Sequence, residues 1–349
     1  MIFPRNTDIL QDVVDEANKS LSYPIDLELD NNSLLPYYNR NSFVIKYSEQ
    51  SDLILLLFNL YPYYKKHVRK LLLIYMTLEI NFERDDYDNV NQLLVRLEKE
   101  GGKLRMEVST QKINDIYLDL QTLFIIGHET WHARFKQNKI LWEKEIVETA
   151  NQIRDIYQKP KTRHERWLFS KIPDVCNSTS QMEECACDRE SVRYLAQYIK
   201  TRGYDSNKIE CILRQILRLV TMLQYSKNLG ELSGFQSNLK GINLHINKLV
   251  PDIIRIGILA CVALDCFDEY DLENIGNILI EEVKEYNEIL ESSYKVGFRD
   301  LWILSCTKMD DSKINVRNEE RCKELKESFV TIGKKIFSDL CALLCHNAD

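Results

Sequence analysis

Glycine and proline are scarce in this sequence. Its 349 residues include only 11 glycines and 7 prolines, whereas these two residues together make up about 12% of an average protein. Because most tight turns need one of them, a chain with so few is expected to have long elements and few hairpins. The sequence therefore favours long helices over a β-sandwich.

The hydrophobic pattern predicts a small sheet in the first part of the chain. Apolar and polar residues alternate in residues 25–29 and again in residues 43–47, which is typical of half-buried strands. Gly101 and Gly102 then punctuate the chain, and the alternation in residues 104–108 predicts a third strand. This strand could bind an extended substrate at the edge of the sheet, or it could simply pair within the sheet.

From residue 110 onward the apolar positions recur at helical spacing. One predicted helix covers residues 110–136. A second covers residues 181–201 and begins at a capping box, Ser180 to Glu183. The remaining pattern is helical as well, so we expect an α+β fold that is predominantly helical, with a small sheet beside the first of these helices and a helical C-terminal half.

The charge balance and the hydropathy argue against two classes of partner. The net charge is −7, from 46 basic and 53 acidic residues, and nucleic-acid binders depend on basic side chains that neutralise phosphates. The longest wholly apolar run, residues 256–264, is about half the length of a membrane span. The ten cysteines form no regular framework and no secretory signal opens the sequence. We therefore expect a cytoplasmic protein with no nucleic-acid or membrane partner.

The most informative motif is H-E-x-x-H, formed by His128, Glu129 and His132 in the first of the predicted helices. Histidines four residues apart lie on one helix face, one turn apart, where they can share a tetrahedral metal ion. Glu129 is close enough to that face to reach a metal-bound water without being a ligand. The alternative is a solvated pair of histidines, which the apolar run at residues 124–126 disfavours.

A catalytic zinc needs a third protein ligand and an open position for water. Glu184 and Asp188 are four residues apart on the second predicted helix, and hence on one face. Glu184 would complete the ligand set, and Asp188 could accept the N–H of a ligand histidine. Glu183 competes with Glu184, but its place in the capping box already gives it a role. An ordinary acidic helix N-terminus is the alternative explanation for these carboxylates.

Cysteine thiolates also bind zinc, and Cys185 and Cys187 lie beside the predicted carboxylate ligand. They lack the C-x-x-C spacing of a structural zinc site. The spacing of Asp188 from Glu184 favours the carboxylate over either thiol.

His128-Glu129-x-x-His132 followed by Glu184-x-x-x-Asp188 resembles the gluzincin zinc metallopeptidases whose second motif is Glu-x-x-x-Asp. Within this family the chain is most similar in arrangement to the soluble Lit-type phage-exclusion proteases. The resemblance covers the two motif helices and the loop between them. It implies a metallopeptidase domain in residues 1–205 and a helical domain in residues 206–349, with a soft boundary.

The resemblance implies a zinc-dependent endopeptidase that cuts a specific protein substrate, in defence or regulation. Zn²⁺ would be held by His128, His132 and Glu184, and Glu129 would act as the general base. A regulatory partner could bind the C-terminal helices, and residues 159–180, expected to be mainly loop, could form a lid. For the group that stabilises the oxyanion, the sequence leaves several candidates open: Tyr157, Arg163, His164, Tyr194, Tyr225 and His245.

Two other functions fit the same motif. One is a non-catalytic, zinc-stabilised module, a degenerate protease that binds a partner protein. The presence of Glu129 argues against it, because a structural metal site needs no base. The other is an amide hydrolase that acts on a small molecule.

Overall fold

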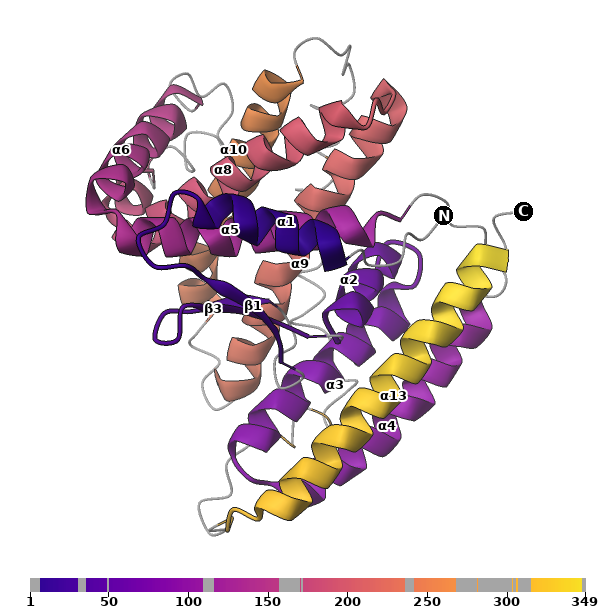
Figure 1. Ribbon diagram of the computed structural model, residues 1–349. Helices are drawn as coiled ribbons and strands as arrows, with labels where there is room; N and C mark the ends of the chain where they lie inside the picture. Colours follow the sequence, from indigo (N-terminus) through magenta and orange to yellow (C-terminus); the bar gives the residue numbers. More distant parts are fainter. Residues whose placement is uncertain are drawn as a thin grey trace.

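The computed structural model describes residues 7–30, 36–48, 50–108, 116–156, 170, 172–235, 242–267, 281, 303, 306 and 315–346. These residues form an α+β fold that is predominantly helical, with a three-stranded sheet that lies against α1 (Thr7–Asn18) and α5 (Leu118–Gln137) (Figure 1). The fold class predicted from the sequence is confirmed.

The sheet has the strand order β1-β3-β2, in which β3 pairs in parallel with β1 and antiparallel with β2. Two of its strands are those that the alternating pattern predicts, whereas β2, only three residues long, was not predicted. Among the described strands β2 pairs with β3 alone, and on its other side the backbone N–H of Tyr38 donates to Glu129 of α5. The strands are β1 (Asp26–Leu29), β2 (Tyr37–Asn39) and β3 (Val44–Tyr47).

The third predicted strand is wrong, because residues 104–108 belong to helix α4 (Tyr87–Val108). Leu104 and Val108 are buried whereas Met106 is exposed, as expected on a helix, where residues four apart share a face. Three apolar residues at alternate positions fit a strand and a helix equally well. The prediction that this segment lies at a sheet edge and binds substrate is therefore wrong as well.

Gly101 lies within a helix, where it contacts a second helix, and it does not form a turn. A Cβ atom at this position would lie 2.5 Å from Cδ1 of Ile336, a residue of α13 (Glu319–His346). The missing side chain lets α13 approach α4 closely, and Figure 1 shows the two helices side by side. They pack with α2 (Gln50–Leu60) and α3 (Lys65–Glu83) into a helical block.

The remaining helices surround α5. Helix α8 (Thr179–Thr201) packs along α5, and α6 (Lys139–Ile156) packs against both. On its other side α8 contacts α10 (Ile242–Cys266), while α9 (Ser206–Phe235) contacts both α3 and α10.

The start of α8 differs from its prediction. The helix begins at Thr179, and its N-cap residue Ser178 makes no side-chain capping hydrogen bond. Residues 172–177, where a loop was expected, are also helical. Residues 159–169, half of the predicted lid, lie outside the described part of the chain.

One hydrophobic core runs through the described structure, from Leu10 near the beginning to Leu344 near the end. Helix α13 reaches back to pack on α2 and α4, and the division near residue 205 stays a prediction. Among the described helices, none has both the length and the apolar composition that crossing a membrane requires.

Candidate metal centre

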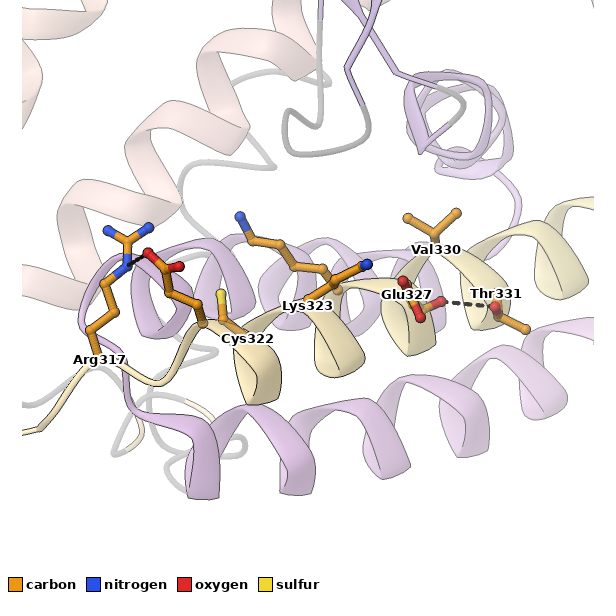
Figure 2. Close-up of a pocket in the computed structure, with 8 residues that line it drawn as sticks. Arg317, Cys322, Lys323, Glu327, Val330 and Thr331 are labelled. Carbon is orange, nitrogen blue, oxygen red and sulfur yellow. Dashed lines mark hydrogen bonds and ion pairs between the residues drawn. The ribbon is translucent and has the colours of Figure 1, made fainter.

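One hollow of the described surface lies along α13 and has a volume of about 740 Å³ (Figure 2). Its described walls are Arg317 and side chains of α13 itself, with no histidine among them. The sequence motifs instead meet at a smaller cavity between α5, α8 and β2.

A close contact between α5 and α8 brings the two motifs together. Gly127 makes it possible, because a Cβ atom there would lie 2.8 Å from Oγ of Ser191 on α8. That hydroxyl donates a hydrogen bond to the carbonyl of Phe124. The next residue after the glycine is His128, which therefore faces α8 directly.

The Nε2 atoms of His128 and His132 face each other at 3.1 Å. Glu184 of α8 spans them, with Oε2 3.5 Å from Nε2 of His128 and Oε1 3.3 Å from Nε2 of His132. Ligand atoms about 2.0 to 2.2 Å from a tetrahedral zinc ion are about 3.3 to 3.6 Å apart. The two contacts of Glu184 are made by different carboxylate oxygens, so the distances bring the three side chains together near one point, with separations close to those of zinc ligands.

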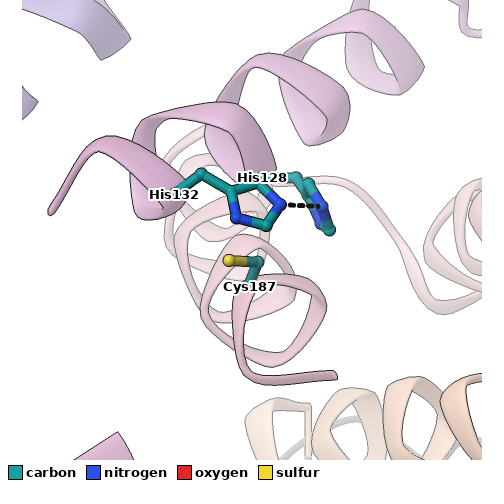
Figure 3. Close-up of side chains that lie close together, drawn as sticks. All are labelled: His128, His132 and Cys187. Atoms are coloured by element: carbon teal, nitrogen blue, oxygen red, sulfur yellow. Dashed lines mark hydrogen bonds between the residues drawn. The ribbon is translucent and has the colours of Figure 1, made fainter. Parts of the chain in front are cut away.

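Cys187 lies beside the same two histidines (Figure 3). A ligand atom from each of His128, His132 and Cys187 lies within 4.8 Å of the others, and all three residues are buried. This buried group could bind a metal ion. The structure therefore offers two candidates for the third ligand, Glu184 and Cys187.

Each histidine is held through its Nδ1 atom by a carboxylate. Nδ1 of His128 lies 2.8 Å from Oδ1 of Asp188, and Nδ1 of His132 lies 2.8 Å from Oε1 of Glu183. A histidine that donates through Nδ1 keeps the lone pair of Nε2 for a metal. The capping role predicted for Glu183 is wrong, because this carboxylate also accepts from Nε1 of Trp142 at 3.2 Å.

Arg255 of α10 neutralises the buried carboxylates. Its guanidinium donates to both oxygens of Asp188, at 2.6 and 2.9 Å, and lies 3.4 Å from Oε2 of Glu184. An ion buried as deeply as Asp188 is costly without such a partner. Arg255 holds the pKa of Asp188 below its usual value, although burial alone would raise it.

The same charges set the pKa values of the histidines. Burial alone would lower the pKa of His128, but Asp188 and Glu184 raise it to about 10. Burial alone would also lower the pKa of His132, but its hydrogen bonds with Glu183 and Glu184 raise it above the usual value. The carboxylates thus favour positive charge between the two imidazoles, which is where a metal cation would bind in place of protons.

Glu129, the predicted base, also faces the cavity between α5, α8 and β2. Its Oε2 accepts the backbone N–H of Tyr38 at 2.7 Å, which leaves Oε1 for another donor. Burial raises the pKa of this carboxyl group, while the two histidines and the bond from Tyr38 oppose the rise.

The cavity has a volume of about 210 Å³ and is lined by the predicted base and all three predicted ligands, together with three residues at and after β2. Cys187 does not line it and packs instead in a small apolar cluster with Phe135 and Ala186. Glu184 therefore faces the open side of the site and Cys187 the closed side. The lining residues are Tyr37, Tyr38, Arg40, His128, Glu129, His132 and Glu184.

Of the predicted candidates for an oxyanion donor, Tyr194 is the one whose side chain is described, and it does not line this cavity. Tyr194 packs toward α1 and α5, where burial and the nearby acidic residue Glu16 raise its pKa. The other predicted candidates lie outside the described residues or side chains: Tyr157, Arg163, His164, Tyr225 and His245. Tyr38 lines the cavity, while its side chain belongs to the hydrophobic core and its buried hydroxyl has no hydrogen-bond partner among the described residues.

The sequence missed three contributors to the site for physical reasons. β2 is too short to show an alternating pattern, so Tyr38 and Arg40 had no signal except their place before a turn. Arg255 lies 67 residues after Asp188, and no local pattern connects them.

Comparison of the chain with protein-family models, with curated proteins and with solved structures finds no match.

Proposed function

We propose that this protein is a zinc-dependent endopeptidase of the H-E-x-x-H gluzincin type that hydrolyses a peptide bond in a cytoplasmic protein. One observation carries the proposal. The Nε2 atoms of His128 and His132 lie 3.1 Å apart, a carboxylate oxygen of Glu184 lies within 3.5 Å of each, and all three side chains line one cavity. Glu129 lines the same cavity, as a general base must.

The chain's own residues divide the work as follows. His128, His132 and Glu184 would hold Zn²⁺, which when bound lowers the pKa of a water molecule and polarises a carbonyl. Asp188 and Glu183 orient the two imidazoles through their Nδ1 atoms.

Glu129 moves the proton. With Oε2 fixed by Tyr38, its other oxygen takes a proton from the attacking water as the new C–O bond forms. It then passes the proton to the leaving amine as the C–N bond breaks, so that a carboxylic acid and an amine result.

A protein substrate is supported by the edge of β2 along which no described strand pairs, and this edge would take the substrate-binding role that residues 104–108 do not have. An extended peptide can add to an open strand edge through main-chain hydrogen bonds. The N–H of Tyr38 points away from the sheet to Glu129, so this edge passes directly along the predicted base.

Glu129→Gln tests the proposal. Gln is nearly isosteric and changes no ligand, but it cannot accept a proton, so we expect a folded, zinc-loaded protein with about 10²- to 10⁴-fold lower activity. Cells that express wild type or Glu129→Gln would be compared by mass spectrometry of newly formed protein N-termini. New termini in wild-type cells alone would support hydrolysis, and identical sets would contradict it.

A second candidate function rests on Cys187. If zinc were bound by His128, His132, Glu184 and Cys187 together, the four-coordinate site would be closed and structural. The zinc content of Cys187→Ser and Glu184→Gln separates the two functions. For a peptidase we expect the first variant to keep about one zinc and the second to lose it. Loss from Cys187→Ser would favour the structural module.

A further inference from the structure

A second cavity lies next to the reaction cavity, between the end of α5 and the start of α6. Its volume is about 270 Å³. Arg40 lines both cavities. Glu183 lines the second cavity and bonds to His132, which lines the first. The wall between them is therefore one layer of side chains, thin enough for neighbouring residues of one extended peptide to occupy both.

The lining of this second cavity is cationic, although the chain as a whole has a net charge of −7. It contains Arg40, Lys136 and Lys139. Glu183, the carboxylate in the described lining, is already bound by His132, Trp142 and Arg40.

The positive charges of the two lysines are not neutralised by strong ion pairs with the described residues, so they can attract a ligand. Lys136 forms no ion pair with the described residues. Lys139 lies 3.6 Å from Glu143, but both side chains are well exposed, and such pairs are weak. The C-terminal end of α5 and the N-terminal end of α6 meet here with opposite partial charges, so the side chains determine the sign of the potential.

The rest of the lining consists of the aromatic side chains of Phe135 and Trp142. Trp142 is fixed, because its Nε1 donates to Glu183. An apolar floor with a cationic rim matches a side chain that has methylene groups and a terminal carboxylate. The volume is slightly below the ~300 Å³ at which small-molecule pockets begin, which suits one side chain of a larger substrate.

We propose that this cavity is a specificity subsite that binds an Asp or Glu side chain of the substrate near the bond to be cut. The inference rests on the proposed peptidase function, because it names the substrate class for that site. Lys136 and Lys139 supply the attraction, and Arg40 links the subsite to the reaction cavity.

Selection of peptides tests the subsite without requiring hydrolysis. Zinc-loaded Glu129→Gln protein would be the bait for a phage-displayed library of random peptides. We expect Asp and Glu to be enriched among the bound peptides. Lys136→Glu/Lys139→Glu in the same background should lose this enrichment and bind the selected acidic peptides at least about tenfold more weakly, because like charges would then face each other.

Lys208→Glu/Lys323→Glu is the matched control, since it changes the net charge equally at exposed positions on α9 and α13. This control should select the same acidic peptides as the bait. The subsite would be refuted if acidic residues were not enriched, or if the control lost the enrichment as well. A failure of the peptidase proposal would show separately, as identical sets of N-termini in cells.

Discussion

Two pairs of long helices in this molecule meet at a glycine, yet they bury opposite kinds of side chain. Gly101 of α4 faces Ile336 of α13, and Gly127 of α5 faces Ser191 of α8. Beside the first glycine the buried residues are mostly apolar, as at Leu97 and Leu104, and Glu100 is the charged exception. Beside the second they include both motif histidines and, on α8, Asp188 and Arg189.

Burial at the α4/α13 pair serves stability, whereas burial at the α5/α8 pair serves the candidate site. Apolar burial stabilises the α4/α13 pair by about 25 cal/mol for each Å² removed from water. Charged groups buried between α5 and α8 must be paired, and apolar residues of similar volume would often be at least as stable. The buried charges at the motif pair have partners: Asp188 pairs with Arg255 and with Nδ1 of His128, and Arg189 pairs with Glu145 and Glu190. Glu184 in turn lies within 3.5 Å of the Nε2 atoms of both histidines. Such an arrangement is expected where a cation must bind.

The largest effect should follow from removing a buried partner at the motif pair. Arg255→Met leaves Asp188 charged and buried, so we expect the free energy of unfolding to fall by about 3 to 5 kcal/mol in urea titrations. Arg105→Met is the matched control at the other pair, where Arg105 binds Asp339 at an exposed position. It should cost less than about 1 kcal/mol. Equal losses would remove the distinction between the two pairs.

At the α4/α13 pair, Ile336→Ala should destabilise the protein by about 2 to 5 kcal/mol, because it leaves a cavity over Gly101. Zinc content, measured by elemental analysis of the folded protein, should not change. Ile140→Ala at an exposed position serves as the control and should have little effect. A loss of zinc from Ile336→Ala would show that the two pairs are coupled.

Asp188→Asn tests the polar pair more gently, because the side chain keeps its shape. The amide is a weaker acceptor for Nδ1 of His128, so we expect zinc affinity to fall about 10- to 100-fold in competition with a chelator. Glu183→Gln should act in the same direction through His132. If zinc affinity were unchanged in both, the carboxylates would be ordinary parts of the helix surface.

The sequence predicted the residues of the α5/α8 pair better than those of the α4/α13 pair. His128, His132, Glu184 and Asp188 have strict spacings of four, which require one helix face whatever the surrounding fold. Residues 104–108 have no such requirement, because their alternation fits both a strand and a helix. Only the burial of Leu104 and Val108 against the rest of the fold decided between them.

What the sequence could not predict are contacts made across the fold. Glu183 looked like a capping residue because local spacing says nothing about Trp142 or His132, which come from other helices. Arg40 and Arg255 reach the site from the turn after β2 and from α10, through long-range packing. A sequence motif determines which residues lie on one face of a helix, whereas the partners of those residues depend on the tertiary structure.

The smallest expected effect concerns Glu100, a buried carboxylate of α4 far from any motif. It is bound by Lys103 at 2.8 Å and lies 3.5 Å from Arg96. Burial alone would raise its pKa, but Lys103, Lys70 and Arg96 lower it below the usual 4.5. A group whose pKa is lower in the folded protein stabilises it above the unfolded pKa, and this contribution is lost as the pH falls through the folded pKa.

We therefore expect Glu100→Gln to lower the free energy of unfolding by about 1 kcal/mol at pH 7. The difference from wild type should shrink below about pH 4.5, as the wild-type carboxylate becomes protonated. Urea titrations at several pH values measure this change, and zinc affinity at pH 7 is the second readout. A buried charge that serves stability alone should leave zinc affinity unchanged, unlike Asp188. If Glu100→Gln weakened zinc binding as strongly as Asp188→Asn, buried charge would not distinguish the functional helix pair from the structural one.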